Sequence, residues 1–480
     1  MQLLNMVGGE SLSSHSGETL ENLNPATTQK ISDIPRSGLS DVDHAVNVAQ
    51  FAFQSHWRDL SPKIRADFLD AVADRLAERL DEFALAESMD TGKPFHLARA
   101  VDIPRSIANF RFFAGAIRHD ETGCHMMADA LNYTIRKPLG VVALITPWNL
   151  PLYLLTWKLA PALAMGNTVV VKPSEMTPTT ATMLAELFNE LDAPPGIFNV
   201  IHGLGPEAGA PLIDHPGVKA ISFTGGTATG AKVAMAAAPH FKKLSLELGG
   251  KNASIVFADC DFEKTVTGVA RAAFLNQGQV CLCGSRILVE RSFYTKFVDA
   301  LVDNVNLMRV GDPMNPEVDM GALISHAHRR KVEGYIQQAT DDGGAILCGG
   351  ERPVMPEPFT YGAWLRPTLI ADIHTQSAVS CEEIFGPVAV IHPFDTVEEA
   401  LEIANSVEYG LSGTVWTTNV TRAHHVASSM DTGMVWVNTW LHRDLRVPFG
   451  GVKNSGVGRE GGKHSLAFFS EMQNICIYTG

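Results

Sequence analysis

The sequence lacks a long hydrophobic run. Its 480 residues contain no uncharged apolar stretch of the roughly 18 residues that a transmembrane helix requires. Residues 1–20 also lack the basic segment and the long apolar segment of a secretion signal. We therefore expect a chain that neither crosses a membrane nor carries a secretion signal.

Cysteine is scarce as well. The chain has seven cysteines, an odd number, spread over positions 124, 260, 281, 283, 348, 381 and 476. Disulfide frameworks are typical of short secreted chains with an even number of cysteines, so we expect a reduced, cytoplasmic protein with free thiols. Cys281 and Cys283 are one residue apart. Because that spacing fits neither a zinc knuckle nor a redox pair, we expect no metal site.

The chain has fewer positively charged than negatively charged residues. The chain has 38 lysines and arginines against 52 aspartates and glutamates, which gives a formal net charge of −14. Nucleic acids and anionic membranes are bound by basic patches, and the cations here are scattered, so we expect neither as a partner. With 45% hydrophobic and 19% charged residues, the composition is that of a globular protein with a large core and two or three domains. Small-molecule chemistry becomes the default function.

Two helices are predicted in the N-terminal part. Residues 40–54 place apolar side chains on one helical stripe behind Ser40 and Asp43, which have the spacing of a capping box. Residues 62–89 continue with helical periodicity and begin with Pro62, a residue that suits the first turn of a helix. We expect one helix over each range.

Short β-branched runs alternate with helical stretches from about residue 139 onward. The strands of a first series are expected in GVVALITP, GNTVVVKPS, GIFNVI, VKAISFTG and LSLELGG, and those of a second in NASIVFA, RILVE, LRPTLI, PVAVIHPF, SGTVWTT and GMVWVNT. The helices between them are expected near 178–191, 227–237, 261–275, 292–308 and 396–405. This alternation predicts parallel sheets with helices on both faces. Loops that follow parallel strands meet at one edge of the sheet, where ligands bind, so we expect TPWNLP, KPSE and FTGG to gather there.

Cys281 is the candidate nucleophile. A thiolate is the reactive species, and a free thiol has a pKa of about 8.5, so the surroundings of Cys281 must activate it. Gly278 and Gly284 allow the backbone to come close, and Glu247, which follows a strand, offers a carboxylate base. The alternative is that Cys281 is a small buried apolar residue.

Seven motifs in the same order carry a resemblance to a known family. They are PWN (147–149), KPSE (172–175), FTGG (223–226), ELGGK (247–251), GQVC (278–281), EEIFGP (382–387) and PFGG (448–451). Over essentially its whole length the chain resembles the NAD(P)-dependent aldehyde dehydrogenases.

The resemblance implies an α/β fold of the aldehyde dehydrogenase type, with two Rossmann-like parallel-sheet domains and a small β oligomerisation element. It implies an NAD-binding domain over 1–119 and 139–249 and a catalytic domain over 250–449. The oligomerisation element falls on 120–138 and 465–480. The segments 130–139 and 470–480 have the pattern of edge strands, which fits a sheet that continues across subunits, so we expect a homodimer or homotetramer.

The resemblance also assigns catalytic roles. Cys281 attacks the aldehyde carbon and forms a thiohemiacetal. The Asn149 side-chain amide and the Cys281 backbone N–H hold the oxyanion, a type of interaction worth about 3–4 kcal/mol. Glu247 is the general base that hydrolyses the resulting thioester. We expect Cys283 to be a packing residue; the alternative is that it protects or traps the nucleophile through oxidation. Asn149 alone could be a turn residue beside Pro147 and Pro151.

For the cofactor, the resemblance implies NAD. A carboxylate at Glu175 can accept hydrogen bonds from both hydroxyls of a ribose and would repel a 2′-phosphate, which favours NAD over NADP. The glycines of FTGGTATG bracket a turn whose N–H groups can face a pyrophosphate, although family members often have Ser where this chain has Gly226. The cofactor-binding residues expected in this way are Trp148, Lys172, Ser174, Glu175, Gly225, Gly226, Gly230, Glu383 and Phe385.

Four segments are most similar to the 2-aminomuconate 6-semialdehyde and 2-hydroxymuconate semialdehyde dehydrogenases. They are VDIPRSIANFRFFAG (101–115), PLYLLTWKLAPALA, KKLSLELGGKN and VNTWLHRDLRVPFGG (437–451). The substrates of these dehydrogenases carry a carboxylate remote from the aldehyde, and the resemblance places Arg105 and Arg443 around it. Guanidinium groups bind carboxylates bidentately. The alternative is that Arg105 is one of several helix arginines and that Arg443 pairs with Asp444.

Three other functions stay open at this stage. A broad-specificity aldehyde dehydrogenase would act on neutral aliphatic, aromatic or retinoid aldehydes. A non-catalytic relative would keep the fold without turnover. A thiol hydrolase would combine Cys281 with one of the 17 histidines and would need no NAD.

Overall fold

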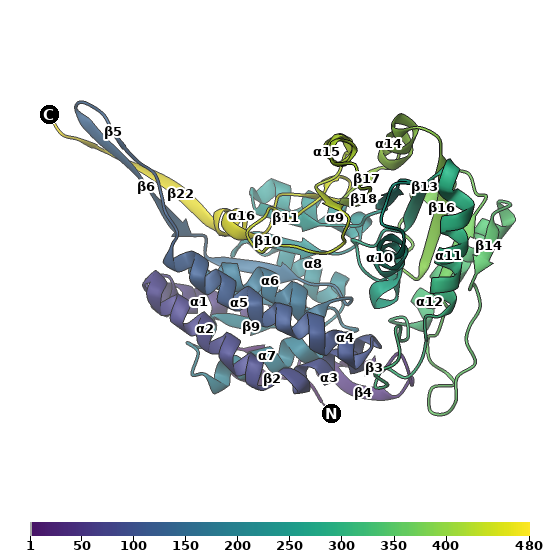
Figure 1. Cartoon of the computed structure of the whole chain (residues 1–480). Coiled ribbons are helices and arrows are strands. Elements are labelled where there is room, and N and C mark those ends of the chain that lie inside the picture. The colour runs from purple at the N-terminus through teal and green to yellow at the C-terminus, as the bar shows by residue number, and fades with distance from the viewer. Residues whose placement is uncertain (1) are drawn as a thin grey trace.

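The computed structural model describes residues 2–480 and contains two large sheets and a projecting arm (Figure 1). None of the helices in this described part is long and apolar enough to cross a membrane. Smaller two-stranded sheets pair β3 (Thr19–Leu23) with β4 (Lys30–Pro35) and β17 (Tyr409–Gly410) with β20 (Val452–Lys453).

The first sheet has eight strands in the order β2-β1-β9-β8-β7-β10-β11-β21. The five strands from β9 to β11 are parallel, and antiparallel strands flank them on both sides. The bounds are β1 (Asn5–Val7), β2 (Glu10–Leu12), β7 (Val141–Ile145), β8 (Thr168–Lys172), β9 (Phe198–Val200), β10 (Val218–Thr224), β11 (Lys243–Glu247) and β21 (Gly456–Val457). The predicted strands of the first series are confirmed, and their parallel order brings the predicted loops to one edge.

Helices cover both faces of this sheet. One face is covered by α1 (Leu39–Ala52), α8 (Ala210–Asp214) and α9 (Thr227–Ala237). The other face is covered by α2 (Pro62–Glu78), α5 (Ile103–Arg118), α6 (Pro151–Ala164), α7 (Thr179–Glu190) and α16 (Gly462–Phe468), with α3 (Leu80–Thr91) and α4 (Phe95–Leu97) beyond them.

Two details of the predicted helices are wrong. The capping box at Ser40 and Asp43 is not used, because the helix starts earlier: Gly38 is the N-cap, and its N–H donates to Asp41 at 2.9 Å. The continuous helix over 62–89 is broken at Arg79, where φ is −103° and ψ is 20°. The apolar periodicity runs through this break, so the turn between α2 and α3 is set by tertiary contacts.

The second sheet has seven strands in the order β14-β15-β16-β13-β12-β18-β19, of which only the pair β14–β15 is antiparallel. The bounds are β12 (Ala253–Val256), β13 (Arg286–Glu290), β14 (Ala345–Cys348), β15 (Thr368–Ala371), β16 (Val388–Phe394), β18 (Ser412–Trp416) and β19 (Met434–Val437). The helices around it are α10 (Phe262–Phe274) and α11 (Tyr294–Asn306) on one face, and α12 (His326–Asp341), α13 (Ala378–Cys381), α14 (Val397–Asn405) and α15 (Val420–Ser429) elsewhere. The second predicted series of strands is confirmed, while α12 and α15 were not predicted.

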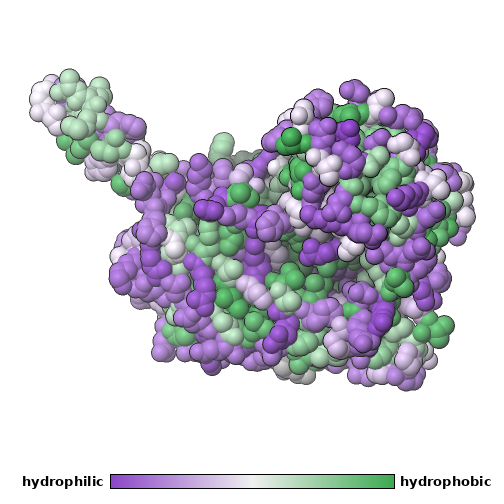
Figure 2. All heavy atoms as spheres, in the orientation of Figure 1, coloured by the Kyte–Doolittle hydropathy of each residue, from purple (hydrophilic) through white to green (hydrophobic). Residues whose placement is uncertain are grey.

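The arm is a three-stranded antiparallel sheet of β5 (Cys124–Met126), β6 (Ala130–Pro138) and β22 (Ser470–Tyr478). β22 pairs with β6 along its whole length, from Ser470 opposite Pro138 to Tyr478 opposite Ala130. The two segments with the pattern of edge strands are thus each other's partner. The ribbon projects from the body, and Figure 2 shows hydrophobic side chains on it in contact with solvent.

Candidate active site

A cavity of about 260 Å³ lies where loops of the two sheets meet. Its wall combines the loops that follow β7, β10 and β11 with the Cys281 loop, the segment before β16, and α12. Of the residues predicted from the sequence, the cavity brings together Trp148, Asn149, Gly225, Gly226, Cys281, Glu383 and Phe385. Most of the predicted catalytic and cofactor-binding residues on these loops therefore share one site.

The loop before Cys281 has an unusual backbone. Asn276, Gln277 and Gly278 all have positive φ, at 54°, 57° and 67°. At Gly278 a Cβ atom would lie 2.2 Å from the carbonyl oxygen of Gly386, so no other residue fits. The loop therefore packs closely against the segment that contains Glu383 and Phe385. This packing limits where the Cys281 thiol can lie.

The glycine pair of the ELGGK motif serves close packing. A Cβ at Gly250 would lie 2.7 Å from the Cys281 carbonyl oxygen, and one at Gly249 would lie 2.5 Å from Glu383 Oε2. The Gly250 N–H donates to Glu383 Oε1 at 2.9 Å. The thiol and the Glu383 carboxylate are therefore close neighbours, and burial together with Glu383 and Glu247 raises the pKa of Cys281 above that of a free thiol. These neighbours favour the thiol over the thiolate, contrary to the activation expected from the sequence.

Asn149 is held from behind by buried polar groups. Its Nδ2 donates to the Gln279 carbonyl at 2.9 Å, and its own carbonyl accepts from Lys93 Nζ at 3.0 Å and Asn276 Nδ2 at 3.2 Å. Lys93 in turn pairs with Asp102 at 2.5 Å. An amide nitrogen has two hydrogens, so one N–H of Asn149 orients the side chain and the other can donate to a ligand in the cavity.

Glu247 lies at the end of β11 and is 5% exposed. Burial and the neighbouring Glu460 raise its pKa well above the usual value, against the opposing effect of Lys158. Glu460 Oε1 accepts from Lys158 Nζ at 2.6 Å and from Ser222 Oγ at 3.1 Å. Glu247 Oε1 has no hydrogen-bond partner within residues 2–480. A carboxylate whose pKa is raised in this way is a stronger base and is suited to take a proton.

Lys158 and Glu460 were missed by the sequence analysis. A lysine inside the apolar helix sequence TWKLAPALA was a signal for Lys158, because a buried cation requires a partner. Glu460 gave no signal, since it is 302 positions from Lys158 in the sequence.

Lys172, Ser174 and Glu175 lie outside the Cys281 cavity. Lys172 Nζ pairs with Glu175 Oε2 at 3.0 Å, and Lys172 lines a neighbouring cavity of about 410 Å³ between β10, α8 and α9. The Ser174 hydroxyl accepts from the Met176 N–H at 3.3 Å. The two cavities give room for a ligand that spans both sides of the loop at Gly225 and Gly226.

The three glycines of FTGGTATG differ in what they contribute. Gly226 is the N-cap of α9, and a Cβ there would meet nothing within 4 Å. The Gly225 N–H donates to the Glu247 carbonyl and the Gly230 N–H donates to the Gly226 carbonyl, at 3.1 and 3.0 Å. Gly230 instead allows close packing, since a Cβ would lie 2.4 Å from Leu248 Cδ2. Of these glycines, only Gly226 is open toward a phosphate at the start of the helix.

Arg105 and Arg443 come from distant parts of the chain and meet at Trp157. Their guanidinium carbons lie 5.7 and 4.8 Å from the centroid of the indole ring. Arg443 Nη2 donates to the hydroxyl of Tyr153 at 3.2 Å. Nε and Nη2 of Arg105 are buried and have no hydrogen-bond partner in the described part of the chain.

Neither arginine has a carboxylate partner within residues 2–480, whereas their neighbours do. Arg99, Arg111 and Arg118 pair with Asp81, Asp74 and Asp67. Asp444, the alternative partner of Arg443, pairs with Arg446 at 2.6 Å. Two unpaired guanidinium groups on one aromatic ring form a site that an anion can satisfy.

His328 and Lys331 of α12 also line the cavity and were not predicted. The His328 ring contacts the rings of Trp148 and Phe385, at centroid distances of 5.2 and 6.3 Å. Trp148 and Phe385 also contact each other at 5.2 Å.

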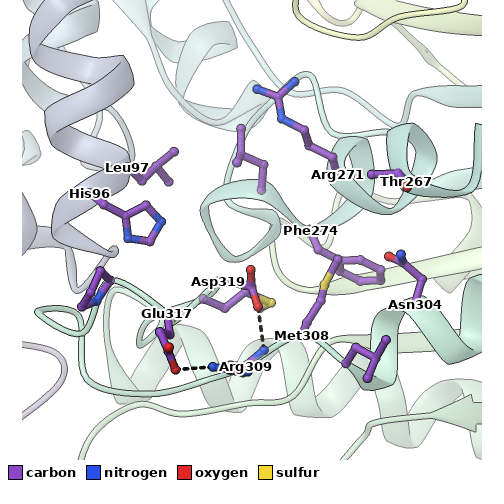
Figure 3. A pocket seen from close by; sticks show the side chains of 14 residues that line it. His96, Leu97, Thr267, Arg271, Phe274, Asn304, Met308, Arg309, Glu317 and Asp319 are labelled. Atoms are coloured by element: carbon purple, nitrogen blue, oxygen red, sulfur yellow. Dashed lines mark hydrogen bonds and ion pairs between the residues drawn. The ribbon is translucent and has the colours of Figure 1, made fainter. Parts of the chain in front are cut away.

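A larger depression of about 690 Å³ lies between α4, α10 and the loop after α11 (Figure 3). None of the predicted site residues lines it. Its Arg309 is neutralised, because Nη1 pairs with Glu317 and the backbone N–H donates to Asp319. The depression is therefore separate from the Cys281 cavity in composition and in chemistry.

Comparison with known proteins extends over the whole chain. The sequence model of the Aldehyde dehydrogenase family matches residues 12–475. The chain is 48% identical over 482 residues to the 2-hydroxymuconic semialdehyde dehydrogenase of Pseudomonas sp. (strain CF600), with 99% of both chains covered. It is 46% identical over 481 residues to the 2-aminomuconic semialdehyde dehydrogenase of Homo sapiens, with 99% of this chain and 98% of the human protein covered.

Solved structures agree with these matches. PnpE from Pseudomonas sp. WBC-3, in complex with nicotinamide adenine dinucleotide, has a TM-score of 0.97 at 40% identity and covers 100% of this chain and 98% of its own. The NAD+ complex of an aldehyde dehydrogenase from Bacillus cereus has a TM-score of 0.97 at 37% identity and covers 100% and 97%. The fold class predicted from the sequence is confirmed.

Proposed function

This chain belongs to the aldehyde dehydrogenase family, and on that premise we propose that it oxidises an aldehyde with a remote carboxylate to the corresponding acid, with NAD as the hydride acceptor. The observation that carries this proposal is the pair of arginines without acid partners at Trp157. The relatives named above act on muconic semialdehydes, so a carboxylated dienoic semialdehyde of the 2-hydroxy or 2-amino type is the proposed substrate.

The residues around the cavity divide the reaction into two steps. The Cys281 thiol loses its proton to solvent and the thiolate attacks the aldehyde carbon, while the Asn149 amide and the Cys281 backbone N–H stabilise the negative oxygen of the thiohemiacetal. NAD, when bound, accepts the hydride that leaves this carbon, and a thioester to Cys281 remains. Glu247 then takes a proton from the water that attacks the thioester, and the acid is released with the thiol restored.

The residues present fit a dinucleotide. The cavities of about 260 and 410 Å³ lie on the two sides of the α9 N-terminus, whose free N–H groups favour a phosphate. Lys172 lines the second cavity and pairs with Glu175, whose carboxylate suits the two ribose hydroxyls and opposes a 2′-phosphate. This arrangement supports NAD as the preferred cofactor over NADP.

A screen for NADH formation tests the proposed function. The wild-type protein is assayed with a carboxylated semialdehyde and with a neutral aldehyde of equal length and unsaturation. We expect kcat/KM to be about 100-fold or more higher for the carboxylated substrate, because two charged hydrogen-bonding groups bind it. Equal values for the two substrates would favour a broad-specificity aldehyde dehydrogenase instead, and no NADH from any aldehyde would contradict both.

The ionisation of Glu247 gives a second expectation. The base must be ionised, so hydrolysis of the thioester is lost as the pH falls through the raised pKa of Glu247. Glu460→Gln removes a negative neighbour, so the pKa of Glu247 falls and the acid limb moves to lower pH. Because Glu460 affects the pKa more than Lys158 does, the double variant Lys158→Met/Glu460→Gln should shift the limb in the same direction by less.

The measurement is single-turnover hydrolysis of the thioester across pH. The double variant is the control for the buried pair, since it removes both charges at once. An acid limb that stays in place in Glu460→Gln, or moves to higher pH, would show that Glu247 is not the group that titrates.

We also propose that the arm joins copies of this chain. Met126, Met472, Ile477 and Tyr478 on the arm are 85%, 56%, 46% and 72% exposed, more apolar surface than an isolated ribbon normally leaves in water. The outer edges of β5 and β22 also carry unpaired backbone groups. A dimer or tetramer in light scattering is the expected result, and a monomer at micromolar concentration would refute it.

The division of the chain follows from the same assignment. We propose that 1–119 and 139–249 form the NAD-binding domain, that 250–449 form the catalytic domain, and that 120–138 and 465–480 form the oligomerisation element. β21 (456–457) pairs with β11 at the edge of the first sheet. This pairing supports adding these two residues to the NAD-binding domain.

A further inference from the structure

His328 connects two loops that come from different sheets. It lies in the first turn of α12, where the Ser325 hydroxyl caps the helix by accepting from the His328 N–H at 3.1 Å. Its Nε2 is 2.7 Å from the carbonyl oxygen of Phe385, in the segment before β16. Its ring packs edge-on against Trp148, in the loop after β7. His328 therefore contacts both aromatic residues of the cavity wall, Trp148 and Phe385.

Phe385 needs such a contact. Its φ is +61°, a conformation that costs free energy for any residue with a side chain and persists only when neighbours hold it. The hydrogen bond to its carbonyl and the ring contacts of Trp148 and His328 are the constraints that act on this residue. Glu383, two residues earlier, is tied to Gly250 by a separate hydrogen bond.

We propose that His328 is a positioning residue for the nicotinamide half of the cofactor: by holding the Phe385 carbonyl and the Trp148 ring it fixes where this pair of contacting rings lies in the wall of the Cys281 cavity. This inference rests on the proposed function, because it requires a nicotinamide nucleotide in the Cys281 cavity. His328 acts through Phe385 and Trp148 and takes no part in the transfer of hydride or protons.

The protonation of the ring is consistent with this role. A carbonyl oxygen only accepts, so Nε2 carries the hydrogen and Nδ1 is the free acceptor in the neutral ring. Burial lowers the pKa of His328, and the charge of Lys331 lowers it further. The ring is therefore neutral at physiological pH and donates one hydrogen bond, to Phe385.

Three variants separate the hydrogen bond from the ring contact. His328→Phe keeps an aromatic ring and removes the donor, His328→Gln keeps an N–H donor without the ring, and His328→Ala removes both. Gln337→Ala is the matched control, because Gln337 is exposed on the same helix and bonds only to Asp341. The readouts are the Kd for NAD and the Kd for ADP-ribose, which lacks the nicotinamide, measured by protein fluorescence or calorimetry.

We expect His328→Phe and His328→Ala to weaken NAD binding by about 5- to 10-fold, the usual effect of one hydrogen bond, while ADP-ribose binds as to the wild type. His328→Gln should recover part of the NAD affinity. For the same variants we expect a deuterium isotope effect with a deuterated aldehyde, because a misplaced ring slows hydride transfer.

Two results would overturn the proposal: an unchanged ratio of the two Kd values in all three variants, or an equal loss of NAD and ADP-ribose, which would show that His328 only maintains the fold. Failure of the proposed function is distinguishable from both, because the wild-type protein would then bind neither nucleotide or would form no NADH.

Discussion

We expect Cys281→Ala to abolish aldehyde oxidation and to leave the binding of NAD intact. Without the sulfur no thiohemiacetal forms, and hydride has no alkoxide carbon from which to leave. Removal of a covalent nucleophile typically costs several orders of magnitude in kcat, about 10⁴-fold or more. Cys281→Ser should be nearly as inactive, because a hydroxyl in the same buried position is far harder to ionise than a thiol.

Mass spectrometry and nucleotide binding give the readouts for this variant. In the wild type, excess substrate and NAD at low pH should trap an acyl adduct that maps to Cys281, since Glu247 is then protonated and cannot activate water. Cys283→Ala is the matched control: Cys283 is 5% exposed and packs in the core behind the loop, so activity should stay within about threefold. An adduct on another residue, or normal turnover in Cys281→Ala, would contradict the role of Cys281 as the nucleophile.

The fold could be predicted where burial dictates the pattern. The parallel strands β7, β8 and β12 are buried on both faces, so they appear in the sequence as continuous β-branched runs between turn residues. α12 was not predicted from the sequence because only Val332, Ile336 and Ala339 of its 16 residues are buried. Such a narrow apolar stripe does not give a clear helical pattern. The break between α2 and α3 at Arg79 was not predicted because the apolar periodicity of the sequence continues through it.

The site divides in the same way. Cys281, Asn149 and Glu247 lie in motifs, so a short local pattern was enough to propose them, and the family match confirms the enzyme class. Their partners could not be found so, because Glu460, His328 and Lys93 come from elements that meet the site only after folding. The pKa of Glu247 is shifted by side chains that come from distant parts of the chain. A local motif does not reveal such contacts.

The arginine pair carries the second large effect. Arg105→Met and Arg443→Met keep aliphatic packing on Trp157 and remove the charge. If each charged hydrogen-bonding group contributes about 1.5–3 kcal/mol, each variant should lower kcat/KM for the carboxylated semialdehyde about 10- to 100-fold. The double variant should lose less than the product of the two single losses, because the two groups share one anion.

The neutral aldehyde and a third arginine are the controls. A neutral substrate makes no charged contact, so its kcat/KM should change less than about threefold in the same variants. Arg111→Met, on the same helix but paired with Asp74, should affect neither substrate, since an exposed pair contributes only about 0–1 kcal/mol. Arg443 also lowers the pKa of Glu247, so the assays belong at a pH where Glu247 is ionised in every variant. Equal losses for both aldehydes would mean that the arginines maintain the packing around Trp157, and the specificity for a carboxylate would have to be sought elsewhere.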